Sequence, residues 1–201
     1  MTLSIAVLEA LRASLPLRGD SWDDSDMPQA AVLVALSEEA QPKVWLGRRT
    51  RHLRHHPGEI AFPGGKREDV DATPWVTARR EAAEEVGLPS SIVRPLGELS
   101  PLVTRTGFEV HPCVAAIAAD FSPVVDTREF ASVFTQPLQR FADHSLFRLE
   151  RFDLDGRPRT VPHYDIDGDN IWGVTAAVLA MLANIAYDAG LDLQRDWKHK
   201  P

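Results

Sequence analysis

Three glutamates, Glu81, Glu84 and Glu85, lie close together in the segment TARREAAEEV, whose composition is typical of a helix. On a helix, Glu81 and Glu85 are one turn apart and Glu84 neighbours both, so their carboxylates approach one another. These like charges repel, which destabilises a helix unless a positive charge neutralises them. Arg79 and Arg80 would do so on an exposed acidic face, whereas hard carboxylate oxygens also suit a magnesium or manganese ion. The segment alone leaves both interpretations open.

Two adjacent glycines, Gly64 and Gly65, precede this segment in the sequence FPGG. Because they lack side chains, they permit a tight turn and allow main-chain groups to lie close to a metal ion or a phosphate. A turn that only ends a strand would also use such a pair. Gly87 follows the glutamates, where it is suited to ending a helix in the left-handed conformation, and Pro89 lies just beyond. The glycines and glutamates together favour a site for a metal ion and a phosphate.

The stretch from Gly65 to Leu88 resembles the Nudix box. That pattern is glycine, five residues, glutamate, seven residues, Arg-Glu, an apolar residue, any residue, Glu-Glu, any residue, glycine and an apolar residue. The matching positions are Gly65, Arg80, Glu81, Glu84, Glu85, Gly87 and Leu88. The sequence departs from the pattern at Asp71, which replaces the glutamate and is separated from Arg80 by eight residues, and at Ala82, a small residue at the apolar position. The extra residue falls in the loop, so the helix is unaffected.

The resemblance implies an enzyme that uses magnesium, or manganese in its place, to hydrolyse a nucleoside diphosphate linked to another group. The metal ligands that it implies are Glu81, Glu84, Glu85 and the Gly65 carbonyl. It also implies that Arg80 orients a glutamate through an ion pair. The general base is Glu81, if the metal does not fully occupy it, or a carboxylate from a distant loop. For the distant carboxylate we choose Glu129, which is otherwise an exposed charge at the end of a strand.

A second resemblance lies immediately upstream, in RTRHLRHHPGEIAFPGG. It is similar to a signature of the coenzyme A pyrophosphatase branch of the family: arginine, three residues, glycine, three residues and Phe-Pro-Gly-Gly. The matching positions are Arg54, Gly58, Phe62, Pro63, Gly64 and Gly65. Farther upstream the match is weaker, because Gly47 and Arg49 stand where threonines are typical. The whole resemblance extends from about residue 30 to about residue 183.

This second resemblance implies that the substrate is coenzyme A or an acyl derivative, cleaved to 3′,5′-ADP and a 4′-phosphopantetheine product. It implies that the substrate-binding residues are Arg54, Gly58, Phe62, Gly64 and Gly65. The spacing of Arg54 favours contact with a phosphate, which arginine binds through paired hydrogen bonds. The histidines of the same loop, His52, His55 and His56, could suggest zinc, but no cysteine lies nearby. We expect them to contact phosphate or to be exposed.

Two other functions compete with this hypothesis. A Nudix enzyme could act on ADP-ribose or a dinucleotide, and a non-catalytic Nudix module could bind a nucleotide without cleaving it. The complete set Glu81, Glu84 and Glu85 argues against the module, because a binding protein does not need the whole metal cluster. A turnover assay with magnesium would separate the two classes.

The overall composition narrows the partners further. The formal charge of −7 and the isoelectric point near 5.5 disfavour nucleic acid and anionic membranes, so an anionic substrate must be attracted by local cations. Cys113 is the only cysteine, which excludes an intrachain disulfide and is typical of the reducing cytoplasm. The N-terminal segment lacks a basic lead and has the spacing of an amphipathic helix rather than of a signal peptide. Nothing in the sequence indicates a protein partner.

The elements that must position these residues follow from periodicity and turn signals. We expect helices over about 1–15, over 77–86 and over 171–187, and strands over 30–37, 43–49, 60–62, 92–100, 108–118, 129–138 and 146–154. The uncharged segment 171–187 is shorter than the roughly 20 residues of a membrane span, so we expect a buried helix. This order predicts an α+β fold with a mixed sheet sandwiched between helices. We expect one domain over 1–201, with an N-terminal helix and connector over about 1–28 and a core over about 30–190.

Overall fold

The computed structural model describes residues 4–17, 21–53, 55–154 and 157–193. An eight-stranded mixed sheet lies at its centre, with the order β3-β2-β1-β7-β5, in which β4 pairs with β1, β6 with β7 and β8 with β2. The central strands β1 and β7 are parallel, and the other pairs are antiparallel. The strands are β1 (Gln29–Ser37), β2 (Lys43–Arg49), β3 (Ile60–Ala61), β4 (Gly64–Lys66), β5 (Arg94–Glu98), β6 (Leu102–Val103), β7 (Glu109–Ile117) and β8 (Phe130–Pro137).

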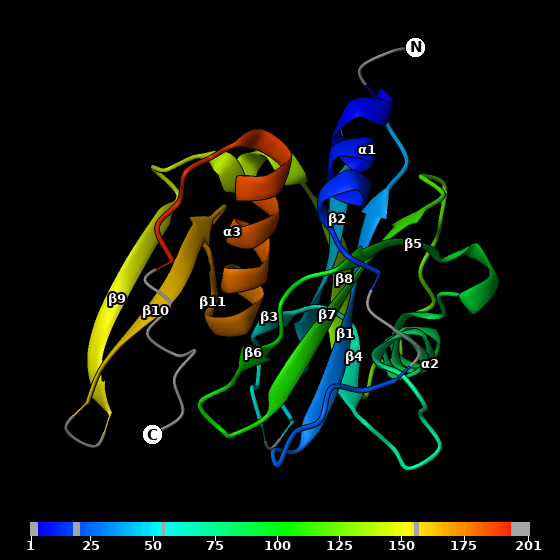
Figure 1. The fold of residues 1–201 in the computed structure, drawn as a ribbon, viewed down its shortest axis with the longest axis horizontal. Coiled ribbons are helices and arrows are strands. Elements are labelled where there is room, and N and C mark those ends of the chain that lie inside the picture. The colour runs from blue at the N-terminus through cyan, green and yellow to red at the C-terminus, as the bar shows by residue number, and fades with distance from the viewer. Residues whose placement is uncertain (1–3, 18–20, 54, 155–156, 194–201) are drawn as a thin grey trace.

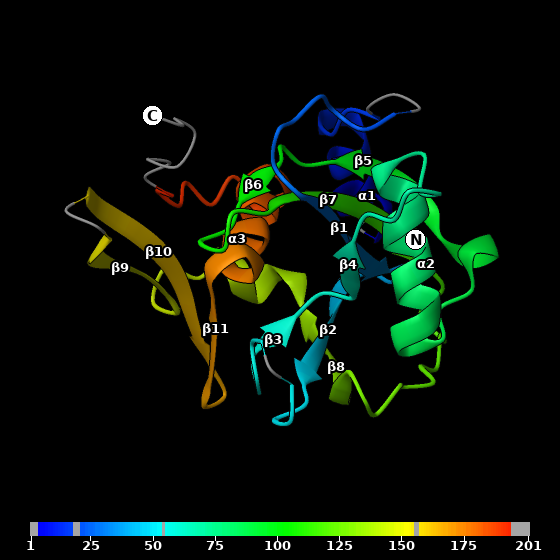
Figure 2. The same ribbon diagram turned by 90° about the horizontal axis from the view of Figure 1, so that it is seen from below.

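Helices cover both faces of this sheet (Figures 1 and 2). Helix α2 (Pro74–Val86) packs on one face, while α1 (Ser4–Ser14) and α3 (Gly173–Tyr187) lie over the other. Alternation along β1 explains the two cores: Leu33 is buried with α2, and Val34 is buried with α1 and α3. The expected α+β fold with a mixed sheet between helices is therefore confirmed.

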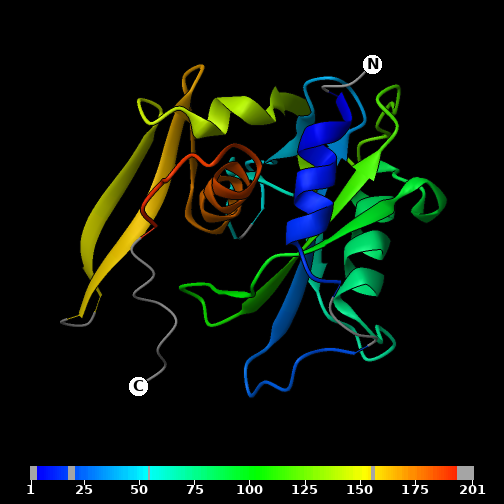
Figure 3. The ribbon, with the colours of Figure 1, turned by 45° about the horizontal axis from the view of Figure 1, so that its top comes forward.

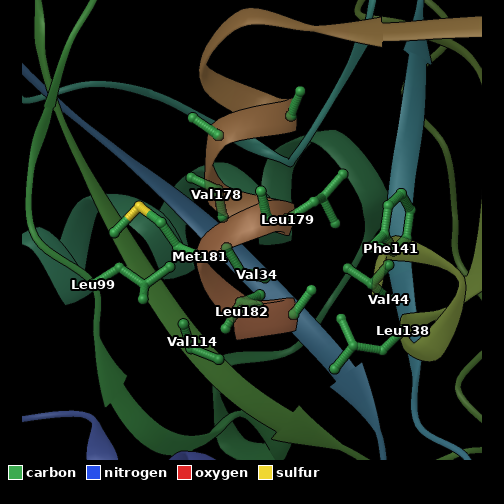
Figure 4. Close-up of a cluster of buried hydrophobic side chains, with 14 of the residues drawn as sticks. Val34, Val44, Leu99, Val114, Leu138, Phe141, Val178, Leu179, Met181 and Leu182 are labelled. Carbon is green, nitrogen blue, oxygen red and sulfur yellow. The ribbon is translucent and has the colours of Figure 1, made fainter. Parts of the chain in front are cut away.

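Helix α3 is almost entirely apolar because neighbours enclose it on several sides. It lies between the main sheet and a separate three-stranded antiparallel sheet of β9 (Phe147–Leu154), β10 (Arg157–Ile166) and β11 (Asp169–Trp172) (Figures 1 and 3). Figure 4 shows part of this core, with labelled side chains that include Val34, Val114, Leu138, Phe141, Val178, Leu179 and Leu182. The predicted buried helix is thus confirmed, although it begins at Gly173 rather than at Ile171. Within the described residues, no helix is both long and apolar enough to span a membrane.

The boundaries of α2 matter most for the site. We expected the helix to begin at Thr77, but it begins at Pro74, because the Thr73 side chain accepts a hydrogen bond from the Val76 amide at 3.2 Å and caps the first turn. It ends as expected before Gly87, whose φ of 67° is left-handed.

Several elements were not evident in the sequence. These are β4, β6, β10, β11 and the short 3₁₀ helices η1 (Ser90–Ile92) and η2 (Leu138–Ala142). Strand β10 contains two prolines and several charged residues, which obscure any alternation in its sequence. Its extended conformation comes from pairing with β9, in a register that joins Arg157 to Leu154 and Tyr164 to Phe147. The Tyr164 hydroxyl then donates to the Phe141 carbonyl at 2.8 Å and ties β10 to η2.

Candidate active site

Two helix carboxylates meet the glycine pair where α2 packs against β4. Glu85 is 5% exposed, and its carboxylate accepts a hydrogen bond from the Gly64 amide at 2.9 Å. The Glu81 carboxylate lies directly against Gly65, where an added Cβ atom would overlap it. The structure therefore brings Glu81, Glu85, Gly64 and Gly65 into one cluster.

The Glu85 carboxylate lies in an unfavourable place for a negative charge. Burial raises the pKa of Glu85 to about 8, and the charges of Glu81 and Glu129 add to this effect, whereas the Gly64 amide and Arg49 oppose it. Burial is also the main cause of a raised pKa at Glu81, against the lowering effect of Arg80. A cation beside these groups would relieve both the burial and the repulsion. Their carboxylate oxygens are hard donors of the kind that magnesium and manganese ions bind.

Glu84 does not join this cluster. Its side chain is 59% exposed, and its carboxylate lies 3.4 Å from Nη1 of Arg80. Successive helical residues are rotated by about 100°, so Glu84 points away from Glu85 although the two are adjacent in sequence. Over the described part of the chain, no three acidic, histidine or cysteine side chains are gathered into a group that could hold a metal ion. The four-ligand set with Glu84 and the Gly65 carbonyl stays a proposal.

Arg80 connects the helix to the loop before it. Its Nη1 atom lies 3.0 Å from Oε1 of Glu81, and its Nη2 atom lies 2.9 Å from Oδ2 of Asp71. Nη2 also donates to the Lys66 carbonyl at 3.1 Å. The guanidinium thus fixes the Glu81 carboxylate relative to β4 and to the loop.

Asp71, which replaces the glutamate of the box, is 1% exposed and is held from several sides. Its carboxylate accepts hydrogen bonds from the Thr77 hydroxyl at 2.8 Å and the Glu68 amide at 3.1 Å, and its carbonyl accepts one from Trp22 Nε1 at 2.8 Å. Burial alone would raise the pKa of Asp71, but the hydrogen bonds from Arg80, the Glu68 amide and Thr77 outweigh it and lower the pKa. Asp71 therefore remains ionised and holds Arg80 in place.

This arrangement predicts the stability of Asp71→Asn. Asparagine keeps the size but loses the charge that pairs with Arg80, so we expect a loss of about 1.5 to 3 kcal/mol in the free energy of unfolding near pH 7. A folded pKa below the unfolded value contributes stability above about pH 4 that is lost as the pH falls through the folded pKa. The difference between wild type and variant should therefore shrink on acidification.

Urea unfolding at a series of pH values measures this difference. Asp120→Asn, which removes an exposed carboxylate from the loop after β7, is the matched control and should cost little. A gap for Asp71→Asn that stays constant between pH 7 and pH 3 would contradict the role assigned to its charge.

Glu129 lies in the turn immediately before β8. Its carboxylate is 3.3 Å from Nη2 of Arg49, and its carbonyl accepts a hydrogen bond from the Thr50 amide at 2.9 Å. Pairing of β2 with β8 thus brings the distant loop residue to the charge environment of Glu85. The sequence by itself gave Arg49 no specific role. It showed Arg49 as one of several arginines before the glycine pair, at a position where a threonine is typical.

Some residues of the upstream signature lie in the core and others lie in a loop at the surface. Arg54 lies outside the described residues. Phe62 is 4% exposed and belongs to the core that contains α3, and its contact with substrate stays a proposal. Burial of the Phe62 ring against apolar strands is favourable because it removes apolar surface from water. Gly58 has a left-handed φ of 74°, which favours glycine. In the same loop His56 Nδ1 lies 2.9 Å from a Glu59 carboxylate oxygen, and His52 and His55 are exposed.

Comparisons with known proteins agree with this geometry. A family model described as the NUDIX domain matches residues 27–159. Two relatives, both named uncharacterized Nudix hydrolase NudL, come from Enterobacter sp. (strain 638) and Yersinia pestis (strain Pestoides F). The first is 38% identical over 168 residues, covering 81% of this chain and 85% of the relative. The second is 36% identical over 155 residues, covering 77% of this chain and 78% of the relative.

A solved structure of DR0079 from Deinococcus radiodurans has the same fold. It is 19% identical to this chain, covers 86% of it and 90% of its own length, and superposes with a TM-score of 0.51. The family model and the two relatives share the segment that carries the glycine pair and the glutamate helix. The chain therefore belongs to the Nudix hydrolase family and is a pyrophosphohydrolase.

Proposed function

We propose that this enzyme hydrolyses the diphosphate of coenzyme A, or of its acyl derivatives, to 3′,5′-ADP and a 4′-phosphopantetheine product. The observation that carries the proposal is the signature over 54–65, which ends in the glycine pair. Gly64 and Gly65 are also the residues that contact Glu85 and Glu81. A recognition segment joined directly to a carboxylate cluster would present the substrate's diphosphate to the catalytic groups.

The proposed metal ligands are Glu81, Glu84, Glu85 and the Gly65 carbonyl. A bound magnesium or manganese ion would polarise the phosphate oxygens and activate water. The chain's own residues prepare this site: Arg80 orients the Glu81 carboxylate, and Asp71 anchors Arg80. The absence of a side chain at Gly65 leaves the space that the Glu81 carboxylate occupies.

Glu129 is the proposed general base. The alternative, Glu81, is packed against Gly65 and held by Arg80, so its carboxylate is committed to the metal cluster. The Glu129 side chain is 38% exposed, which gives its carboxylate access to an attacking water. The Arg49 guanidinium beside it would orient this carboxylate to accept the proton.

The local charges support an anionic substrate despite the overall charge of −7. The Arg49 charge acts on Glu85, and Lys66 and Arg67 directly follow the glycine pair in the sequence, so cations accompany the carboxylates. We place Arg54 among the groups that contact the diphosphate. The cytoplasm, where the buried thiol of Cys113 stays reduced, is the proposed location.

A panel of diphosphates assayed side by side with magnesium tests the substrate. We expect kcat/KM for coenzyme A to exceed the values for ADP-ribose, a dinucleoside polyphosphate and nucleoside triphosphates. The reason is that the upstream signature resembles that of enzymes that cleave coenzyme A. Faster cleavage of ADP-ribose would make the coenzyme A assignment wrong and leave the family assignment intact. Binding of nucleotides without any turnover would instead favour the non-catalytic alternative.

A further inference from the structure

A pocket of about 570 Å³ lies at the end of the main sheet where β1 and β7 begin and β4 ends. The residues that line it include Gln29, Lys66, Arg67, Asp69 and Phe108. None of them belongs to the carboxylate cluster, and the signature over 54–65 does not contain them. The pocket thus combines two cations, an aromatic ring and an amide outside the groups assigned so far.

Both cations of the pocket are held in place by aromatic rings. The Lys66 ammonium lies 5.1 Å from the centre of the Phe108 ring, and the Arg67 guanidinium lies 5.1 Å from that of Trp22. Arg67 Nη1 also donates to Oε1 of Gln29 at 2.8 Å. Cations that are already positioned lose less conformational entropy when an anion binds.

Gln29, another residue that lines the pocket, is also held in place. Gln29 is 8% exposed, and its amide nitrogen donates to the Asp23 carbonyl at 2.9 Å and to Oε1 of Glu109 at 3.2 Å. These bonds orient the Gln29 oxygen toward Arg67. A buried amide that is held on both sides supports a defined binding geometry for the guanidinium.

The pocket adjoins the catalytic cluster through the backbone of β4. Lys66 follows Gly65 directly, and its carbonyl accepts a hydrogen bond from Arg80, the residue that also holds Glu81. A diphosphate bound at the cluster has a substituent on each side. Because the cluster and the pocket both adjoin β4, one of these substituents can extend along β4 into the pocket.

The charges of the pocket identify which substituent fits. Lys66 and Arg67 outnumber the single carboxylate Asp69, and Phe108 offers an aromatic surface. The pantetheine half has neither an aromatic ring nor a phosphomonoester, whereas the adenosine half of coenzyme A has both. Resting on the proposed function, we propose that this pocket binds the 3′-phosphorylated adenosine half, with the 3′-phosphate at Lys66 and Arg67 and the adenine at Phe108.

Calorimetric titration of the full chain with 3′,5′-ADP and with 5′-AMP, in buffer containing magnesium, tests this assignment. The two ligands share the 5′-phosphate, so the difference in Kd reports the 3′-phosphate. Wild type should bind 3′,5′-ADP at least about tenfold more tightly, because hydrogen bonds to charged groups contribute that much. Lys66→Ala and Arg67→Ala should each remove most of this preference and leave Kd for 5′-AMP nearly unchanged.

Lys43→Ala is the matched control. It removes one cation at the start of β2, where Lys43 pairs with Glu39 at 3.2 Å, and should leave both Kd values unchanged. Equal binding of the two ligands by wild type would overturn the assignment, as would Lys66→Ala and Arg67→Ala proteins that melt normally and keep the preference. Phe108→Leu provides a second test, since it should weaken the binding of 3′,5′-ADP and of 5′-AMP by similar factors.

Kinetics separate this inference from the proposed function. If the pocket is correct, Lys66→Ala should lower kcat/KM for coenzyme A much more than for dephospho-coenzyme A. A wild-type enzyme that prefers 3′,5′-ADP in calorimetry but does not cleave coenzyme A would overturn the proposed function and leave the pocket intact. Cleavage of coenzyme A that is insensitive to Lys66 and Arg67 would overturn only the pocket.

Discussion

Replacing Glu85 with glutamine is expected to abolish most of the turnover while the protein stays folded. The carboxylate is buried on α2 and directed at Gly64, whose amide can still donate to the glutamine oxygen. Glutamine also replaces a carboxyl group whose ionisation is opposed by burial and by the charges of Glu81 and Glu129, so the free energy of unfolding should be unchanged or slightly higher. Loss of a metal-binding charge removes several kcal/mol of transition-state stabilisation, which is more than about a hundredfold in kcat/KM.

Steady-state kinetics over a range of magnesium concentrations, together with thermal unfolding, measure both parts of this expectation. Glu39→Gln, at the turn between β1 and β2, removes a carboxylate that pairs with Lys43 and should leave turnover unchanged. Near-normal kcat/KM for Glu85→Gln at limiting magnesium would contradict the assignment of Glu85 as a ligand. Inactivity caused by unfolding would appear as a lost thermal transition and would contradict the prediction of a retained fold.

Gly65→Ala and Gly64→Ala are expected to fail in different ways although the glycines are adjacent. The three heavy atoms nearest to a Cβ atom at Gly65 all belong to the end of the flexible Glu81 side chain, which can move aside. The fold should therefore survive, while the displaced carboxylate costs roughly a hundredfold or more in turnover. A Cβ atom at Gly64 meets the backbone of Ala31 and Val32 on the paired strand β1, which cannot move without disturbing the sheet. Gly64→Ala should therefore destabilise the protein as well as inactivate it.

Parallel measurements of thermal unfolding and kcat/KM distinguish the two outcomes. Gly107→Ala provides a control for the substitution itself, because an added Cβ atom there meets no heavy atom within 4 Å, although its φ of 82° still carries some strain. An active Gly65→Ala enzyme would show that Glu81 does not need its present position. Equal losses of stability at Gly64 and Gly65 would contradict the distinction between a side-chain contact and a backbone contact.

The sequence by itself determined the features that depend on short spacing. Helix α2, its left-handed end at Gly87 and the glycine pair before it are local patterns, because hydrogen bonding and steric freedom act between residues a few positions apart. The same local pattern indicated a pyrophosphohydrolase of the Nudix family, which the comparisons confirm. Short apolar runs bounded by turn residues predicted most of the main strands, and the order of helices and strands predicted the α+β fold.

Only the tertiary structure decided which of the charged side chains are buried at the site and which are exposed to solvent. Spacing treated Glu84 and Glu85 alike, yet packing against β4 buries Glu85 and leaves Glu84 in solvent beside Arg80. Helical periodicity cannot state which face meets a neighbouring strand, because that depends on segments far away in the sequence. The bond from Trp22 to Asp71, the ion pair of Arg49 with Glu129 and the whole of β10 depend on such distant segments too. Their free energy comes from groups that meet only after the chain has folded, so no local pattern encodes them.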